Sequence, residues 1–575
     1  NLLPKLTASL KINLAIYDNA VAWLNTLADY EIRPRTTIRI GARMGKPEGS
    51  KHREMNPKIH GLWPVGFNVG AQRRIRDAAR KGEGVSVGIR VCPFCDTQTW
   101  RGVCLGGVGE AKPHKAVETN FVGVIKQDLH TEDLWKECLE ITHQATEPEV
   151  KGSKGLRNAE KMPEDMLKSV LRHRNGTSAF RDGTIRFDMT ELGITHFNIK
   201  EIGITLEKVK ELGYEKDIKG NPLVDENQII EIFPQDIVLP LCTDAADEGA
   251  GQVLTRVANF IDEELQTIYK QKPYYNVKKK EDLVGHLVIG LSPHTSAGIV
   301  GRIIGFSHTQ GGFAHPYWHD AQRRDLDGEE TAIFLVMDGF LNFSRQYLPD
   351  RRGGRSMDAP LVLSTLLNVE EIDDEVFDVD TVWKYPLELY EGALEFKHPS
   401  DFKIEQIKDR VGKVEQYEGL GYTHPVSNMN VGVKNSAYKS LATMMEKMDG
   451  QLKLAAKIRA SHLDKVAQLI VEGHFVRDIK GNLRKFTKQT YRCTTCNTIY
   501  RRIPLSGTCS TCKKGNIVFT IAEGTVKKYL AATLNLVSYD GISPFVRQAI
   551  QLLNERVESV FGRDKTKQLG LGDFC

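Results

Sequence analysis

Residues 314–341 read AHPYWHDAQRRDLDGEETAIFLVMDGFL, and three carboxylates stand at alternate positions within this stretch. Asp325, Asp327 and Glu329 are separated by single residues, and Gly328 permits a tight bend of the backbone. On an extended segment alternate side chains point to the same side, so we expect the three carboxylates to converge. Such a cluster is costly without a cation, because like charges in close contact raise one another's pKa values. Oxygen ligands of this kind suit Mg²⁺, so the stretch predicts a magnesium site for phosphoryl transfer.

The same pattern is also typical of an acidic turn on a solvated surface. The neighbouring sequence favours the metal site. An apolar run, AIFLVM at residues 332–337, follows the carboxylates closely and indicates a buried strand or helix. Arg323 and Arg324 come just before them and supply positive charge that can face phosphate groups. We therefore expect the acidic loop to lie at the end of a core element.

The composition is that of a globular protein with several domains. The chain has 575 residues, 26% of them charged and 41% hydrophobic, with a net charge of +4. A charge so near balance neither requires nor excludes a nucleic-acid partner. The first residues lack a basic start followed by an apolar run, and residues 283–306, the most apolar stretch, are interrupted by His286, Pro293 and His294. We expect a soluble, intracellular chain without membrane spans that begins inside a longer protein.

Short glycine-rich and β-branched segments alternate with helical patterns along the chain. The helical patterns cover residues 20–30, 252–270 and 436–473, and the last is interrupted at Gly450. Many short strands flanked by helices predict an α+β fold with compact barrels.

Seven of the ten cysteines fall into two tight groups. Paired C-x-x-C spacing in an intracellular chain is typical of metal binding rather than of disulfides. The second group has two such pairs, twelve residues apart, a strong zinc-ribbon pattern whose four thiolates close a structural shell. The first group has three cysteines, and a histidine is the nearest plausible fourth ligand. The predicted zinc ligands are Cys493, Cys496, Cys509 and Cys512 in the ribbon, and Cys92, Cys95, Cys104 and His114 in the first group.

Several longer strings share one resemblance. They are GARMGKPE (41–48), DGTIRFD (182–188), GHLVIGLSPHTSAGIVGRIIGF (285–306), the acidic stretch (314–330), LNFSRQYLPDRRGGRSMDAPLVL (341–363) and YRCTTCNTIYRRIPLSGTC (491–509). In this order they resemble the C-terminal half of the large, catalytic subunit of archaeal family D DNA polymerases, over nearly the whole chain. The resemblance implies a core of two double-psi β-barrels, as in multisubunit RNA polymerases. One barrel would supply the carboxylates for two Mg²⁺ ions, and the other would supply basic residues.

The resemblance also implies roles for individual residues. Asp327 and Glu329 match the family's two catalytic aspartates, and Asp325 stands where the family usually has asparagine. Glu329 is one methylene longer than the usual residue, which changes the reach of the second ligand. Without the resemblance, the basic loop at residues 41–54 is typical of a glycine-rich surface loop. With it, the implied contacts to the incoming nucleotide or primer end are Arg43, Lys46, Lys51 and Arg53. Among the histidines near the acidic loop, His294 in the tight SPHTSAG turn is the best candidate for contact with substrate, although a lone histidine is more often a hydrogen-bonded structural residue.

The implied activity is that of a DNA-directed DNA polymerase, which transfers nucleotides from dNTPs to a primer 3′-hydroxyl in archaeal replication. The family likeness further implies a heterodimer with a small subunit that carries a proofreading nuclease, located in the archaeal cytoplasm with the nucleoid. Two other functions stay open. One is a two-barrel DNA-dependent RNA polymerase, and the other is a non-catalytic scaffold paralogue.

The tail KQLGLGDFC fits the sliding-clamp-binding pattern Q-x-x-[LIM]-x-x-F through Gln568, Leu571 and Phe574. The alternative is a frayed terminus with accidental spacing. We expect the clamp-binding peptide to occupy residues 566–575.

The expected organisation follows from these features. It comprises a first barrel region (1–130) with the basic loop and a zinc-binding insertion (about 92–114), an α+β connecting region (131–235), a second double-psi barrel with the acidic loop (236–365), a helical clamp-like DNA-binding region (366–482), a zinc ribbon (483–525), C-terminal helices (526–565) and the clamp-binding tail (566–575).

Overall fold

The computed structural model describes most of the chain with its side chains. The described residues are 20–32, 48–66, 69, 72–81, 84–104, 114, 117–128, 130–144, 146–155, 162–293, 295–343, 361–421, 428–431, 434–458, 461–496, 498–513, 515–519 and 521–562. The predicted site residues that lie outside the described residues are Arg43, Lys46, His294, Gln568, Leu571 and Phe574. No helix in the described part is long and apolar enough to cross a membrane.

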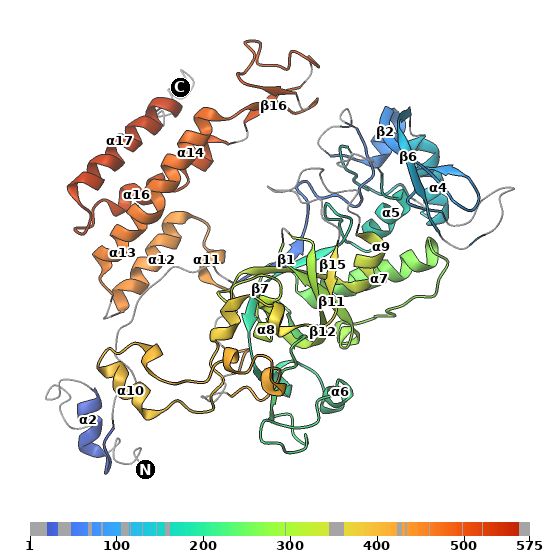
Figure 1. Cartoon of the computed structure of the whole chain (residues 1–575). Coiled ribbons are helices and arrows are strands. Elements are labelled where there is room, and N and C mark those ends of the chain that lie inside the picture. The colour runs from blue at the N-terminus through green and yellow to red at the C-terminus, as the bar shows by residue number, and fades with distance from the viewer. Residues whose placement is uncertain are drawn as a thin grey trace, which may run out of the picture.

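An eight-stranded mixed sheet carries the acidic loop (Figure 1). Its order is β1-β7-β13-β10-β12-β11-β14, with β15 paired to β12 and β14 paired back to β7. The last pairing closes β7, β13, β10, β12, β11 and β14 into a ring, so these strands form a barrel. The strands are β1 (Ser50–Arg53), β7 (Arg186–Gly193), β10 (Asp236–Pro240), β11 (Leu287–Leu291), β12 (Ala297–Ser307), β13 (Gly311–Ala314), β14 (Glu330–Leu335) and β15 (Val362–Ser364).

The interior of the barrel is crowded because its strands bury nearly all their residues. Every residue of β10 and the first six of β7 are buried, as in strands that are covered on both faces. The indole of Trp318 lies against Gly290 of β11 and Gly301 of β12. A Cβ at these positions would lie 2.3 and 2.8 Å from the indole, respectively. These strand glycines therefore leave the room that the large aromatic side chain occupies.

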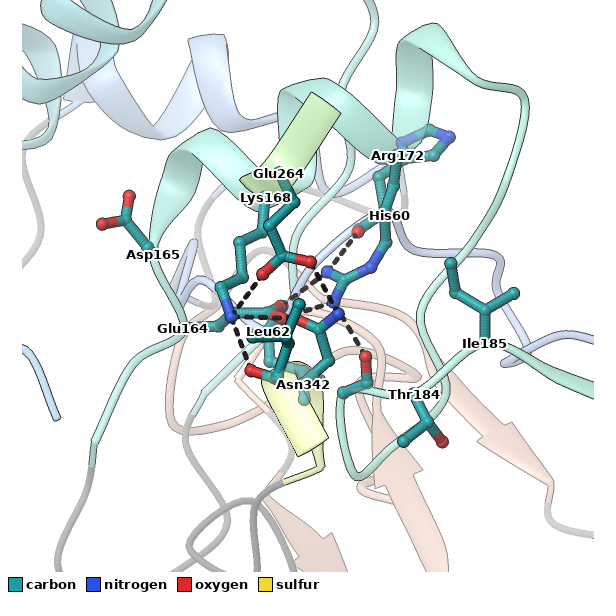
Figure 2. Close-up of polar contacts among 12 residues, drawn as sticks. His60, Leu62, Glu164, Asp165, Lys168, Arg172, Thr184, Ile185, Glu264 and Asn342 are labelled. Carbon is teal, nitrogen blue, oxygen red and sulfur yellow. Dashed lines mark hydrogen bonds and ion pairs between the residues drawn. The ribbon is translucent and has the colours of Figure 1, made fainter. Parts of the chain in front are cut away.

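Three helices pack beside the barrel and share a buried network of charges (Figure 2). They are α5 (Met166–Arg174), α7 (Ala250–Thr267) and α9 (Val336–Asn342). The Lys168 ammonium lies 2.9 Å from Glu264 and donates to Asn342 at 2.8 Å, and Arg172 donates to both oxygens of Glu164 at 2.6 and 2.9 Å. Because buried charges are costly unless paired, these contacts hold the helices in one arrangement.

The same network reaches the two strands that flank the acidic loop. Asp338 of α9 accepts a hydrogen bond from the amide of Ile185 at 2.7 Å. Helix α9 begins directly after β14, and Ile185 directly precedes β7. The ends of β7 and β14 are thereby joined on the side away from the loop.

Smaller sheets and helices surround the barrel. Two of these sheets lie in the first 130 residues and include the first cysteine group. The strands outside the eight-stranded sheet are β2 (Gly84–Val91), β3 (Gln98–Thr99), β4 (Val103–Cys104), β5 (Val117–Glu118), β6 (Asn120–Asp128), β8 (His196–Asn198), β9 (Ile229–Glu231), β16 (Tyr491–Cys493), β17 (Ile499–Tyr500) and β18 (Ile517–Phe519). The remaining helices before residue 400 are α2 (Ala20–Leu27), α3 (Ile75–Lys81), α4 (Thr131–Ile141), α6 (Leu206–Glu211), α8 (Pro316–Asp320) and α10 (Leu387–Leu394).

The C-terminal helices form a second hydrophobic core, distinct from that of the barrel (Figure 1). They are α12 (Met444–Lys457), α13 (Leu463–Ile470), α14 (Val476–Lys488), α15 (Glu523–Lys527), α16 (Leu530–Leu536) and α17 (Pro544–Phe561), and the short helix α11 (Ala437–Ser440) precedes them. The predicted break at Gly450 is wrong, because α12 runs through this residue. A glycine inside a helix costs only about 1 kcal/mol, which the packing of Met448 and Leu452 into this core offsets.

The predicted α+β class is confirmed. The described strands form one closed ring. It includes β7, which lies within residues 131–235 and therefore outside the range 236–365 that was expected for the second barrel. The double-psi connectivity, the second barrel and the domain boundaries stay predictions.

Candidate functional site

The acidic loop is a turn between α8 and β14. Gly328 has a φ of 88°, in the left-handed region that glycine adopts without strain, so the expected tight bend is present. Asp325 and Asp327 are exposed, and Glu329 is half-buried. The backbone oxygen of Glu329 accepts a hydrogen bond from the amide of Glu191 at 2.9 Å, which ties the end of the loop to β7.

The structure does not gather the three carboxylates into one ligand cluster. In the described residues, the sets of three or more potential ligands whose atoms lie within 4.8 Å of one another are the two cysteine groups. Glu329 forms an ion pair with Arg324 instead. The premise of an extended segment was wrong, because residues 326–328 form a turn and alternate side chains no longer share a side. The role of these carboxylates as metal ligands stays a prediction.

Buried side chains of α8, the helix that precedes the acidic loop, contact strand β7. The Nε2 atom of His319 lies 3.2 Å from the backbone oxygen of Leu192, and its Nδ1 atom lies 3.3 Å from the carboxylate of Glu191. Both side chains are almost completely buried. This pair fixes α8 to the strand that also binds Glu329.

Two further titratable groups of the same segment are buried. Burial lowers the pKa of His315 to about 3, so this histidine is neutral and acts as a cap that accepts from the amide of Tyr317 at 3.1 Å. Burial raises the pKa of Asp320 to about 7. Neither group reaches the solvent-exposed carboxylates, so both act as supports for the loop.

The basic segment lies across β7 from the acidic loop. In register, Lys51 of β1 pairs with Asp188 of β7, and Asp188 pairs on its other side with Ala332 of β14. Glu330, the first residue after the loop, pairs with Thr190 on the same face. Strands are spaced about 5 Å apart, so the two outer strands β1 and β14 lie about 10 Å from each other. Lys51 and the acidic loop thus share one face of the sheet.

The predicted arginines divide between the two sides of this site. Arg53 of β1 donates to Asp188 at 2.6 Å. Arg324 is bound to Glu329, and the exposed Arg323 lies 3.7 Å from Asp373. Asp188 was not predicted as a site residue, although it is the last residue of the string DGTIRFD. That string does not show that β1 and its Arg53 lie beside Asp188.

Both cysteine groups have the donor set of zinc sites. The four cysteine sulfurs of the ribbon lie within 4.8 Å of one another, with Cys493 and Cys512 at 3.6 Å and Cys496 and Cys509 at 3.4 Å. Strands β16, β17 and β18 form the three-stranded sheet beside them.

In the first group, the sulfur of Cys92 lies 3.4 Å from Nε2 of His114, and the sulfur of Cys104 lies 3.6 Å from the same atom. Cys95 completes the set at 3.8 Å from Cys104. Soft sulfur and imidazole ligands in sets of four suit a closed, structural Zn²⁺ site, so the predicted ligand sets are confirmed as clusters.

Comparison with known proteins agrees with these observations. The family model described as "DNA polymerase II large subunit DP2, catalytic domain" matches residues 143–447, and the model described as its "central domain" matches residues 4–123. The first range contains β7, α8, the acidic loop and β14, and the second contains β1 and the first cysteine group.

Relatives from several archaea align over nearly the whole chain. The DNA polymerase II large subunit of Archaeoglobus fulgidus is 43% identical over 579 residues, which cover 96% of this chain and 50% of the relative. That of Methanothermobacter thermautotrophicus is 42% identical, covering 97% of this chain and 50% of the relative, and that of Natronomonas pharaonis is 39% identical, covering 97% and 48%. The chain thus spans about half the length of these curated relatives. Since the catalytic-domain model alone matches more than half of the chain, the chain belongs to the family of DNA polymerase II (family D) large subunits.

Proposed function

We propose that this chain carries the polymerase active site of a family D DNA polymerase and extends DNA primers with dNTPs. The observation that supports this most directly is the catalytic-domain match across the acidic loop and its two flanking strands. The basic strand β1 on the opposite side of β7 supports it further, because a triphosphate needs cations on one side and metal-bearing carboxylates on the other.

In the proposed site, Asp325, Asp327 and Glu329 hold Mg²⁺. The donor chemistry fits, since all three offer hard oxygen ligands, and the exposed Asp325 and Asp327 have no ion-pair partner among the described residues. Two bound Mg²⁺ ions supply charge stabilisation at the α-phosphate and the leaving pyrophosphate. Glu329 joins them only when its ion pair with Arg324 opens.

The basic residues bind and orient the substrates. Lys51 and Arg53 contact the triphosphate or the primer end from β1, and Arg323 and Arg324 contact phosphates beside the acidic loop. Arg43, Lys46 and His294 belong to the same proposed set. The protein's contribution is then mostly positioning and electrostatics.

The finer features of the family complete the proposal. The closed ring of mixed parallel and antiparallel strands supports a double-psi barrel as the core. The name "large subunit" of the relatives supports a small-subunit partner, and the zinc clusters would hold their modules in shape. The tail with Gln568, Leu571 and Phe574 would bind a sliding clamp.

One observation favours a second candidate, a non-catalytic scaffold. Arg324 neutralises Glu329, and the three carboxylates do not converge. A scaffold would bind primed DNA through the same basic strand without extending it.

Primer extension separates these functions. The full-length large subunit, assembled with its small subunit, is given a primed template, Mg²⁺ and either dNTPs or NTPs. We expect extension with dNTPs that stops when EDTA removes the metal. Extension with NTPs alone would indicate an RNA polymerase, and binding of primed DNA without extension would indicate a scaffold.

A further inference from the structure

Arg53 is held from two directions on the face that carries the acidic loop. Its NH1 group donates to Asp188 at 2.6 Å, and its guanidinium carbon lies 5.0 Å from the centre of the Phe180 ring. The opposing hydrogen bond and the aromatic ring restrict both the direction and the plane of the guanidinium. A long, flexible side chain is thereby ordered before any ligand binds, which lowers the entropic cost of binding.

The rest of the guanidinium is left for a ligand. The Nε and NH2 groups of Arg53 have no hydrogen-bond acceptor among the described residues, and the side chain is 20% exposed. Nε–H and NH2 form one edge of the guanidinium with two parallel donors. This edge matches two oxygens of a phosphate group.

The carboxylate of Asp188 lies in an unusual environment. Its side chain is only 5% exposed, and its Oδ1 atom is buried without a hydrogen-bond partner among the described residues. Burial raises the pKa of Asp188 to about 6, although Arg53 acts in the opposite direction. A buried ion pair with an unsatisfied oxygen is poor at stabilising a fold, because desolvation costs as much as the attraction returns. The fold gains little from this pair, so its main consequence is the ordering of Arg53.

The neighbouring arginine has a carboxylate partner of its own. Arg186 also lies 5.0 Å from the Phe180 ring, but it is bound by Asp182. Asp182 therefore binds the NH2 group of Arg186, while Asp188 binds Arg53. Both pairs lie on the face that Glu330 and the acidic loop share, one strand away from β14.

We propose that Asp188 and Phe180 are positioning residues that hold the Arg53 guanidinium ready to bind the triphosphate of the incoming nucleotide. This inference rests on the proposed polymerase function and deepens it by assigning the substrate group that β1 binds. Asp188 acts through Arg53 and does not touch the substrate itself.

The central test is steady-state kinetics of single-nucleotide incorporation by the full-length large subunit with its small subunit, at saturating Mg²⁺ and primed DNA. Asp188→Asn keeps the shape of the side chain and removes its charge. We expect it to raise the KM for dNTP about 10-fold or more, the effect of a weakened hydrogen bond to a charged group, with the Kd for primed DNA within about twofold of the parental value. An unchanged KM in a folded Asp188→Asn enzyme would overturn the inference.

A double-mutant cycle shows whether Asp188 acts through Arg53. On an Arg53→Gln background, Asp188→Asn should change the KM by less than about twofold, because the group that it positions is already gone. Multiplicative effects of the two substitutions would mean that they act separately, and would refute the positioning role.

A matched control comes from the same sheet. Asp236 is buried to the same degree as Asp188, and Arg302 donates to it at 2.8 and 2.7 Å with its own side chain 29% exposed. Asp236→Asn should lower the melting temperature at least as much as Asp188→Asn and leave the KM for dNTP unchanged. A KM effect of equal size in the control would attribute the change to general loosening of the sheet.

Two milder variants keep the inference testable if Asp188→Asn does not fold. Arg53→Lys retains the charge at a partly exposed position but loses the paired donors, and we expect a rise in KM of about 10-fold. Phe180→Leu removes the stacking surface and should raise the KM about threefold. A parental KM in both would overturn the inference. Failure of the polymerase function itself has a different signature, since the parental protein would then bind primed DNA without extending it with dNTPs.

Discussion

The zinc ribbon and the acidic loop are both short segments rich in potential metal ligands, yet the structure treats them differently. In the ribbon the backbone amides of Thr495 and Cys496 donate to the sulfur of Cys493 at 3.3 and 3.5 Å, and the amide of Cys512 donates to Cys509 at 3.5 Å. These local turns position each pair of thiols within the ribbon segment itself. In the acidic loop no backbone donor among the described residues collects the carboxylates, and Arg324 forms an ion pair with Glu329. Ligands that local turns position can come together within one segment. Carboxylates repel one another, so they converge only when a cation and the surrounding fold hold them together.

The largest effect should follow from removing two ligands of the zinc ribbon. Replacing Cys493 and Cys496 by serine should remove one zinc ion per chain and unfold residues 491–519, because structural zinc contributes about 10 kcal/mol or more to its module. Metal analysis and hydrogen exchange of β16 to β18 measure both changes. Cys138→Ala, which removes a buried thiol outside both groups, should keep all the zinc. A full zinc complement in the double variant would refute the ribbon assignment.

The next largest effect should come from Asp327. Asp327→Asn should reduce primer extension by about 10³-fold or more, since loss of a metal ligand removes most of the charge stabilisation in the transition state. The melting temperature without metal should stay the same or rise slightly, because a like charge is removed from the loop. Glu226→Gln, an exposed acidic position in the connection between β8 and β9, should leave extension unchanged. Parental activity of Asp327→Asn would show that the proposed site is wrong.

Substitutions of Glu329 test whether this residue binds metal or only pairs with Arg324. Glu329→Gln should lower extension about 10- to 100-fold, and Mn²⁺, which tolerates looser geometry, should restore part of it. Glu329→Asp returns the residue that the family usually has and should keep activity within about threefold of the parental level. Mg²⁺ titrations of both variants measure these effects. If Glu329→Gln were fully active, its ion pair with Arg324 would be its whole role.

The smallest effect concerns Asp320, a buried acid in the support of the acidic loop. Burial raises its pKa to about 7. The folded state therefore holds this proton more tightly than the unfolded state, and the contribution of Asp320 to stability falls as the pH rises from about 4 to about 7. Asp320→Asn should gain stability relative to the parental protein by about 1–2 kcal/mol between pH 5 and pH 8. Urea unfolding at both pH values measures this gain, and an equal difference at both would contradict it.

The chemistry of individual segments could be predicted because it is local. The ribbon ligands follow from two C-x-x-C pairs, and the first set follows from one such pair with Cys104 and His114 nearby in the sequence. The tight bend at Gly328 follows from a glycine in a polar loop. Helix α7 was also within reach, since its apolar spacing is a property of the helix alone. That α12 continues through Gly450 could not be predicted, because packing against the second core outweighs the helix propensity of one residue.

What the sequence by itself determined is therefore the inventory: an α+β chain of the family D large-subunit family, two zinc-ligand groups, an acidic loop and a basic loop, whose Lys51 and Arg53 the structure places on strand β1. The tertiary structure alone decided how the last two meet. Strand β7 lies between them, Asp188 binds Arg53, and Arg324 binds Glu329. These relations join residues more than 130 positions apart or depend on the path of a turn. Strand order and side-chain pairing are set by the packing of the whole barrel, and no local pattern encodes them.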